Sequence, residues 1–465
     1  MRRTCFSASA QKTVFAHYML ANQDYAPGDS GSELVIASYE REILQAQAIG
    51  IDGFALNAGG WIKEPRYIRR ASEMFEAAYR LHSNFKLMFS ADMCCSNDAA
   101  DVEDMMRRFA NNDRYSSVYF KWNGKFVLTT FAGERLGTGF WMHLRRDLEQ
   151  GSHPSENAAP GALSYASGVP SSAPLPIYLV PAFFWGGELP QPNDIEAGLA
   201  NNKKVIDGAF YWGIAGVPGL GHAPDQIPSS EAYGKVLHRA GKLYMAPICL
   251  QFWGANAGRY YEYSGFWGMR NLWMSAIEVS HPEWVEIITW NDFIEGTYVS
   301  PIDDPTKYER ANDLGASQAP TTPGFFHTHR GATELLAFFI NWYKTGKQPA
   351  ITNDSVYWAY RTQLAPKSES DTGNMKIYGP VEDAVYITAN LTAPAVLRVY
   401  FGKEFTSVPL PAGSTDWKVP MIAGYVPHFL LTRETKPLAE ASGEDTISPS
   451  GTYHDFYYST GYMHN

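Results

Sequence analysis

The sequence has no run of basic residues and no long apolar segment. Of its 465 residues, 38 are Lys or Arg and 48 are Asp or Glu, so the formal net charge is −10. Without a basic patch we expect no nucleic acid partner and no attraction to an anionic membrane surface. No apolar run is long enough to cross a bilayer. This balance is compatible with a neutral partner.

Cysteine is also scarce. The four cysteines form no C-x-x-C pair; they are Cys5, Cys94, Cys95 and Cys249. Neither a zinc ribbon nor a thiol redox motif is therefore indicated. His327 and His329 are separated by one residue but have no carboxylate neighbour at ligand spacing. We expect neither a metal ion nor a cofactor.

Aromatic residues, in contrast, are abundant. They make up 14% of the chain, with 13 Trp and 28 Tyr. Such rings can stack on the apolar faces of sugars, but they also fill the cores of large proteins. Composition alone leaves a carbohydrate site and a large aromatic core as alternatives.

From Thr13 to about Trp290, short apolar runs alternate with segments of helical periodicity, which is typical of repeated β-α units, and we expect the domain that they form to span residues 12–345. The strand candidates are Thr13–Leu20, Asp52–Asn57, Phe85–Met93, Phe126–Phe131, Ile177–Phe184, Gly208–Trp212, Leu243–Leu250 and Trp284–Trp290. Eight strands with intervening helices predict an α/β fold, a (β/α)8 TIM barrel. The stretch 151–176, rich in Ser, Ala, Pro and Gly, is expected to be a surface insertion on the face away from the active site.

Beyond Gly346, short alternating runs separated by turn residues predict a smaller C-terminal β-sandwich at 346–435. Residues 1–11 are expected to be an N-terminal extension and residues 436–465 a polar tail. Sequons at Asn353 and Asn390 slightly favour secretion, although the N-terminal residues lack the apolar stretch of a signal peptide. We expect an extracellular, monomeric protein.

In a TIM barrel the chemistry lies at the carboxyl ends of the strands. Polar and aromatic residues that a carbohydrate site would need recur there: Tyr18, Asn57, Asp92, Tyr211, Trp212, Trp290 and Asn291. Asp292 follows the eighth strand candidate, and Glu295 comes three residues later.

Hydrolysis of a glycosidic bond needs two carboxyl groups, one that donates a proton and one that attacks or activates water. A three-residue offset in an extended loop spans up to about 10 Å, which includes the roughly 6.5–9.5 Å separation of an inverting enzyme. The spacing does not exclude the shorter separation of a retaining enzyme. Elsewhere, a D-x-x-E pair usually caps a helix or carries surface charge.

The segment Trp284–Pro301 (WVEIITWNDFIEGTYVSP) resembles the end-of-barrel motif of glycoside hydrolase family 71, the α-1,3-glucanases or mutanases. Other strand candidates are similar to strands of that family in the same order, and the resemblance covers about residues 12–435. It implies an inverting endo-hydrolase of α-1,3-glucan, a fungal cell-wall polysaccharide. Asp292 and Glu295 become the catalytic pair, with Glu295 as general acid and Asp292 as general base. The seven residues at the strand ends become candidates for substrate contact.

Two alternatives remain open. Glu295-Gly296-Thr297 is more similar to the endo-mannosidases of family 99, so one alternative is an endo-glycosidase that acts on mannan or another glucan. The other is a cell-wall protein that binds polysaccharide without cutting it, and the presence of both Asp292 and Glu295 argues against it. In each case the partner is a polysaccharide.

Overall fold

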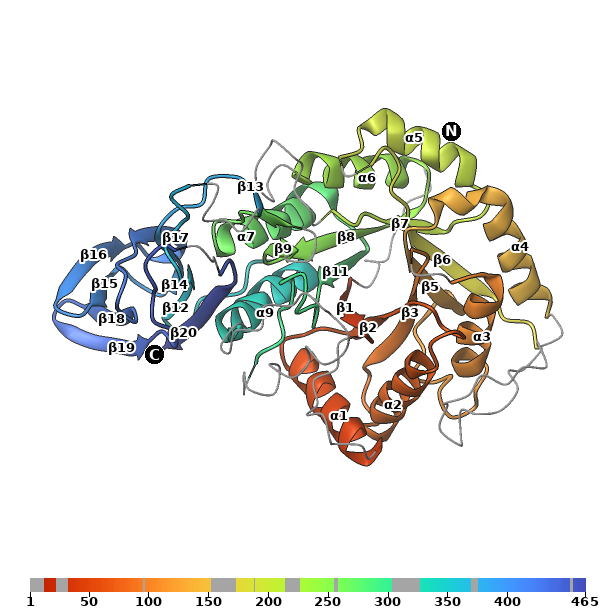
Figure 1. Cartoon of the computed structure of the whole chain (residues 1–465), viewed down its shortest axis with the longest axis horizontal. Coiled ribbons are helices and arrows are strands. Elements are labelled where there is room, and N and C mark those ends of the chain that lie inside the picture. The colour runs from red at the N-terminus through yellow and green to blue at the C-terminus, as the bar shows by residue number, and fades with distance from the viewer. Residues whose placement is uncertain are drawn as a thin grey trace.

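The computed structural model describes residues 12–21, 32–94, 97–151, 173–187, 189–213, 226–254, 258–302, 327–368, 375–451 and 455–465. Within them, a curled sheet surrounded by helices adjoins a group of smaller sheets formed by the C-terminal part of the chain (Figure 1). The expected N-terminal extension and residues 152–172 of the expected insertion lie outside the described residues.

The curled sheet contains eight parallel strands, and each coincides with a segment that the sequence predicts. In spatial order they are β7 (Gly208–Phe210), β8 (Leu243–Cys249), β11 (Trp284–Ile288), β1 (Thr13–Met19), β2 (Gly53–Ala58), β3 (Lys86–Asp92), β5 (Lys125–Phe131) and β6 (Ile177–Ala182). A short antiparallel strand, β4 (Lys121–Trp122), pairs with β5. In the described part of the chain no ladder joins β6 to β7, although the Asp207 N–H donates to the Leu179 carbonyl across this seam (2.8 Å). The α/β class is confirmed, and the ladder stops short of a closed barrel.

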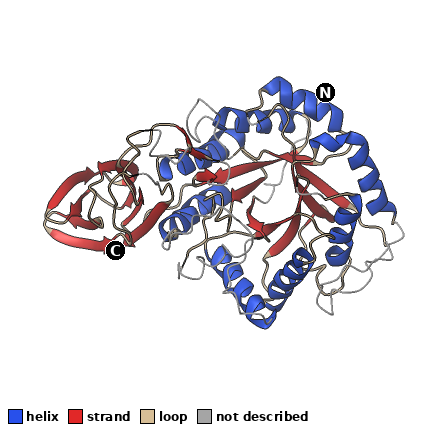
Figure 2. Ribbon diagram, viewed as in Figure 1, coloured by secondary structure: helices blue, strands red, loops and turns tan. Residues whose placement is uncertain are grey.

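Helices cover the outer face of the curled sheet (Figure 2). They are α1 (Ser32–Ala48), α2 (Arg66–Arg80), α3 (Ala99–Ala110), α4 (Gly137–Gln150), α5 (Pro192–Asn202), α6 (Ile227–Arg239), α7 (Phe266–Ser275) and α9 (Arg330–Thr345), with shorter turns at Glu134–Leu136 and Ala276–Ser280. Local sequence explains their starts and their inner faces. In α3, for example, Asp98 and Asp101 form a capping box, and Val102, Met105 and Phe109 are buried.

Alternation along each strand divides the side chains between the helices and the interior of the curled sheet. In β1, Tyr18 packs on Tyr39 of α1, so Phe15 and His17 face the interior. At the N-terminal end of the interior, four aromatic rings lie 5.3–6.0 Å from the ring of Trp284; they belong to Phe15, Phe120, Trp122 and Tyr178. This end is a packed aromatic core, so a site must lie at the opposite end of the strands.

Two antiparallel sheets pack face to face after α9, and we call them the sandwich. One has the order β17 (Gly413–Pro420), β14 (Ala384–Leu391), β12 (Ser355–Arg361), β20 (Tyr458–His464); the other has β16 (Glu404–Leu410), β15 (Ala395–Phe401), β18 (His428–Arg433), β19 (Lys436–Ser442). Trp358 of β12 stacks on Phe429 of β18, with ring centroids 4.1 Å apart. A small sheet joins β9 (Phe252–Gly254) and β10 (Arg259–Tyr261), which follow β8 in the chain, to β13 (Lys376–Tyr378), which follows β12.

In place of the polar tail expected at 436–465, the structure has β19 and β20. The sequence of β20 does not predict a strand because it contains Gly461, and glycine is a poor strand former. A Cβ at Gly461 would lie 2.5 Å from the indole of Trp358, so the packing of the sandwich accounts for this glycine.

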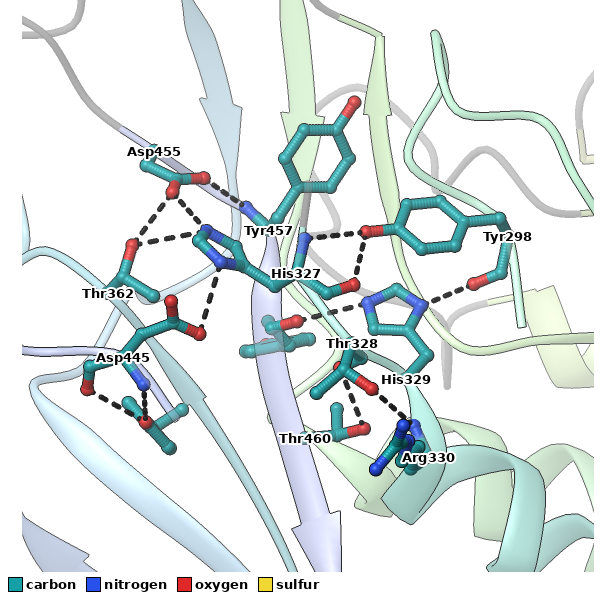
Figure 3. A network of polar contacts seen from close by, with 12 residues as sticks. Tyr298, His327, Thr328, His329, Arg330, Thr362, Asp445, Asp455, Tyr457 and Thr460 are labelled. Carbon is teal, nitrogen blue, oxygen red and sulfur yellow. Dashed lines mark hydrogen bonds and ion pairs between the residues drawn. The ribbon is translucent and has the colours of Figure 1, made fainter. Parts of the chain in front are cut away.

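A polar network around His327 joins the sandwich to the curled sheet (Figure 3). The His327 ring lies between Asp455 (Nε2 to Oδ2, 2.5 Å) and Asp445 (Nδ1 to Oδ2, 3.2 Å). Burial lowers the pKa of His327, but the two carboxylates outweigh it and raise the pKa to about 10. His329 lies within hydrogen-bonding distance of the Tyr298 and Tyr458 carbonyls (2.6 and 3.0 Å). A protonated His327 thus forms a buried ionic contact between the two parts.

Candidate active site

Residues 289–300, which we call the carboxylate loop, follow β11 at the carboxyl end of the curled sheet. Backbone hydrogen bonds draw the two ends of the loop together. Thr289 N–H donates to the Thr297 carbonyl (2.9 Å), Val299 N–H to the Thr289 carbonyl (3.0 Å), and Ser300 N–H to the Trp290 carbonyl (3.0 Å). The loop therefore presents Asp292 and Glu295 at the end where active sites of such folds lie.

Asp292 and Glu295 are held close together within the loop. The Asp292 N–H donates to Thr289 Oγ1 (2.8 Å), and Asp292 Oδ1 accepts a hydrogen bond from the Glu295 N–H (3.2 Å). Burial raises the pKa of Glu295 to about 8; Asp292 and Asp92 act in the same direction, and Arg259 opposes them. The raised pKa favours the protonated form of Glu295, which is the state that a general acid requires.

Three of the seven expected contact residues face the interior of the curled sheet near this end. Asp92 ends β3, is 8% exposed and accepts a hydrogen bond from the Cys94 N–H (3.0 Å). Asn57 precedes the end of β2, opposite Ser90 in the ladder. Trp212 follows β7, and its ring lies edge-on to His17 and to Phe131 (4.6 and 4.9 Å between centroids).

Three others lie on the helix side of the sheet. Tyr18 and Trp290 are 0% exposed. The Tyr18 hydroxyl and the Trp290 indole N–H donate to the two oxygens of Glu42 in α1 (3.0 and 2.8 Å). Tyr211 stacks on Tyr233 of α6, with centroids 4.9 Å apart. Because these rings offer no surface to the interior, we assign them to packing between strands and helices.

Asn291 holds the loop against β1. Its Oδ1 accepts from the Met19 N–H (2.7 Å), and its Nδ2 donates to the Met19 carbonyl (3.1 Å). The side-chain amide thus pairs with one residue of β1 as a neighbouring strand would. This fixes the start of the carboxylate loop, and Asn291 is 1% exposed.

Two further charged residues near the site, Glu286 and Arg259, could not be recognised from the sequence alone. Glu286 faces the interior and pairs with His17 (Oε1 to Nδ1, 2.6 Å), and both side chains are 0% exposed. Burial raises the pKa of Glu286, although His17 opposes the shift. A glutamate at an inward position of the apolar strand β11 was the available signal for it. Arg259 lies in the small sheet, whose short strands have no recognisable period.

Within the described ranges, no group of three or more His, Cys, Asp or Glu side chains could hold a metal ion. Cys94 and Cys249 are free thiols, and burial raises the pKa of Cys249 to about 12. Among the helices that the structure describes, none combines the length and the apolar character needed to span a membrane.

A protonated carboxyl group beside a second carboxyl group, at the carboxyl end of an α/β sheet, is the arrangement that glycoside hydrolases use. The model of Glycosyl hydrolase family 71 matches residues 10–461, and the chain belongs to this family. It is therefore a glycoside hydrolase.

Curated relatives span nearly the whole chain. It is 28% identical to the glucan endo-1,3-alpha-glucosidase agn1 of Schizosaccharomyces pombe, over 96% of this chain and 93% of that protein. It is 26% identical to mutanase Pc12g07500 of Penicillium rubens, over 97% and 88%. Among solved structures, a GH99 endo-alpha-mannosidase from Bacteroides thetaiotaomicron has a TM-score of 0.47 and 12% identity, covering 73% of this chain and 99% of that chain.

Proposed function

We propose that this protein is an endo-acting α-1,3-glucan hydrolase that inverts the anomeric configuration. The observation that best supports hydrolysis by two carboxyl groups is the raised pKa of Glu295 beside Asp292, and inversion is the mechanism that the resemblance to family 71 implies. Glu295 donates its proton to the glycosidic oxygen as the bond from that oxygen to the anomeric carbon breaks. A water molecule attacks the anomeric carbon from the opposite face, and Asp292 accepts the proton that the water loses. Exchange with solvent then restores both carboxyl groups.

The choice of α-1,3-glucan rests on the activities named for the two fungal relatives. Asn57, Asp92 and Trp212 are the proposed substrate contacts, because their positions face the interior beside the carboxylate loop. A neutral polysaccharide needs hydrogen-bonding groups and an aromatic ring rather than a cluster of charge. We also propose an extracellular location at the cell wall and a monomeric state.

We infer further that the curled sheet completes a (β/α)8 barrel. Side chains take the place of a ladder at the seam between β6 and β7. Asp207 Oδ2 accepts from the Leu179 N–H (2.9 Å), and Arg145 bonds to both Asp207 Oδ2 and the Ile177 carbonyl (3.0 and 3.3 Å). These bonds support a closed arrangement of the two edge strands.

The proposal is tested by incubating the protein with α-1,3-glucan, β-1,3-glucan and α-mannan. We expect reducing ends from the first polymer only, and the newly formed end should be the β-anomer by proton NMR. Asp292→Asn and Glu295→Gln should each lower kcat by about 10²–10⁴-fold. Glu278→Gln, an exposed carboxyl-to-amide change, should have no effect.

Each component of the proposal has its own contrary result. Equal activity of all the variants would refute the catalytic assignment. Release of the α-anomer would refute inversion. Cleavage of mannan alone would show that the substrate is mannan and not α-1,3-glucan. Binding without cleavage by the wild type would show that the protein binds polysaccharide and does not hydrolyse it.

A further inference from the structure

The C-terminal segment of the chain reaches the carboxylate loop. Strand β20 belongs to the sandwich, where Tyr458 lies opposite Arg361 of β12. The residue before it, Tyr457, leaves the sandwich and enters an aromatic cluster beside the loop. Its ring lies 4.6 Å from Trp253 and 5.8 Å from Tyr298, measured between centroids.

Tyr457 contacts the loop on both sides of Glu295. Its hydroxyl donates to the Phe293 carbonyl. Its ring covers Gly296, where a Cβ would lie 2.5 Å from Tyr457 Cε1. Gly296 also has a φ of +63°, which L side chains rarely adopt. The loop and Tyr457 therefore fit each other only when residue 296 is a glycine.

Two further donors hold the same turn. Gln251 Nε2 donates to the Gly296 carbonyl (2.7 Å), and the Trp253 N–H donates to the Glu295 carbonyl (2.8 Å). Gln251 Oε1 in turn accepts from the Tyr458 N–H (3.0 Å), so the amide links the loop to the C-terminal strand. A buried carbonyl that loses its donor costs free energy. Movements of the turn that break these bonds are therefore disfavoured.

The C-terminal segment is itself firmly anchored. The Tyr457 N–H donates to Asp455 Oδ1 (3.0 Å), and Asp455 pairs with His327 (Figure 3). On the other side, the Tyr458 hydroxyl donates to Glu262, which forms a buried ion pair with Arg361 (2.6 Å). Tyr457 thus stands between two anchored neighbours and can act as a fixed support.

We propose that Tyr457 is a positioning residue for Glu295, so that the sandwich completes the active site. This inference rests on the proposed role of Glu295 as general acid. Tyr457 acts through Phe293 and Gly296 and not on the substrate. It keeps the acid at a fixed place, and its ring excludes water from the turn that carries the acid.

The kinetic test compares Tyr457→Phe with a matched control, Tyr343→Phe. The Tyr343 hydroxyl also donates to a backbone carbonyl, that of Pro282 (2.8 Å), at the opposite end of β11. We expect both changes to lower the Tm by similar amounts. Only Tyr457→Phe should lower kcat, by about 10- to 100-fold with little change in KM, because misplacement of a catalytic group by about 1 Å has effects of that size. Equal kcat values for the two variants would overturn the proposal.

A second measurement needs no substrate. The carboxyl band of Glu295 is followed by infrared titration, as the difference between each protein and its Glu295→Gln counterpart. Tyr457→Ala, or Tyr457→Leu if the alanine variant does not fold, should admit water and lower the titration midpoint; Tyr457→Phe should retain the wild-type value. An unchanged midpoint in the truncated variant refutes the proposal. A lowered midpoint in a protein that cuts no glucan refutes the proposed function and leaves the positioning role standing.

Discussion

Replacing His327 with glutamine should weaken the contact between the sandwich and the curled sheet. The change removes the cation that lies 2.5 Å from Asp455 and 3.2 Å from Asp445 and leaves two carboxylates facing a neutral amide. Breaking a buried ion pair by removing one partner costs about 3–5 kcal/mol. Asp445 is 31% exposed, so water screens part of the remaining charge. We therefore expect a loss of about 3 kcal/mol in the free energy of unfolding.

Urea unfolding followed by tryptophan fluorescence measures this loss, and its pH dependence identifies the cause. The pKa of His327 is about 10 in the folded protein, against a reference value of 6.5. Its stabilisation is therefore complete below pH 6.5 and disappears as the pH rises to about 10. The difference between wild type and His327→Gln should shrink over that interval.

His428→Gln provides the control. His428 also lies beside a carboxylate, Glu440, at 2.9 Å, but this pair is on the surface of the sandwich. Its loss should cost less than about 1 kcal/mol. If the two substitutions destabilise the protein equally, or if the effect of His327→Gln does not vary with pH, the assigned role of His327 as a buried cation is wrong.

Three more predictions concern the site. The kcat for glucan cleavage should fall as the pH rises through about 8, because Glu295 must be protonated to act as the acid; a rate that is flat up to pH 10 would contradict this. Gly296→Ser should lower both kcat and Tm and should reduce the free energy of unfolding by about 1–3 kcal/mol, because the new Cβ meets the ring of Tyr457. Wild-type values of kcat and Tm would show that the turn accommodates the side chain and would contradict this prediction. Trp212→Ala should raise KM several-fold, whereas Tyr18→Phe should lower Tm and leave KM unchanged, since only the Trp212 ring lies on the interior side. A raised KM in Tyr18→Phe and an unchanged KM in Trp212→Ala would contradict the assignment of Trp212 as a substrate contact and of Tyr18 as a packing residue.

The parallel strands could be predicted because each is a short apolar run between helical segments, as in KLMFSAD of β3 and LYMAPIC of β8. Strands buried on both faces have this continuous pattern. Strands β9, β10 and β20 could not be predicted in the same way. The first two have three residues each, and β20 (YSTGYMH) contains Gly461 and lacks the continuous apolar run of the parallel strands. No local period marks such strands.

The carboxylates of the site could be found from their position after the last strand, but the orientation of their neighbours could not. Side chains alternate along a strand, so an uncertainty of one residue reverses the face on which a side chain lies. Tyr211 and Trp212 are adjacent, yet one stacks on α6 and the other lies beside His17. Where a strand is apolar throughout, no alternation of polar and apolar residues shows which side chains point to the interior and which point to the helices.

The proposed chemistry requires that other segments of the chain cover the carboxylate loop. A carboxyl group that is still protonated at neutral pH must be shielded from water, and one that donates to a defined oxygen must be held in place. Residues 289–300 are too few to supply a covering layer of their own. Gln251, which follows β8, and Trp253 of β9 provide part of it, and Tyr457, the residue before β20 of the sandwich, provides another part. On this reasoning the sandwich belongs to the catalytic unit, and a chain that ended before residue 455 would keep both carboxylates and lose the surface that makes one of them an acid.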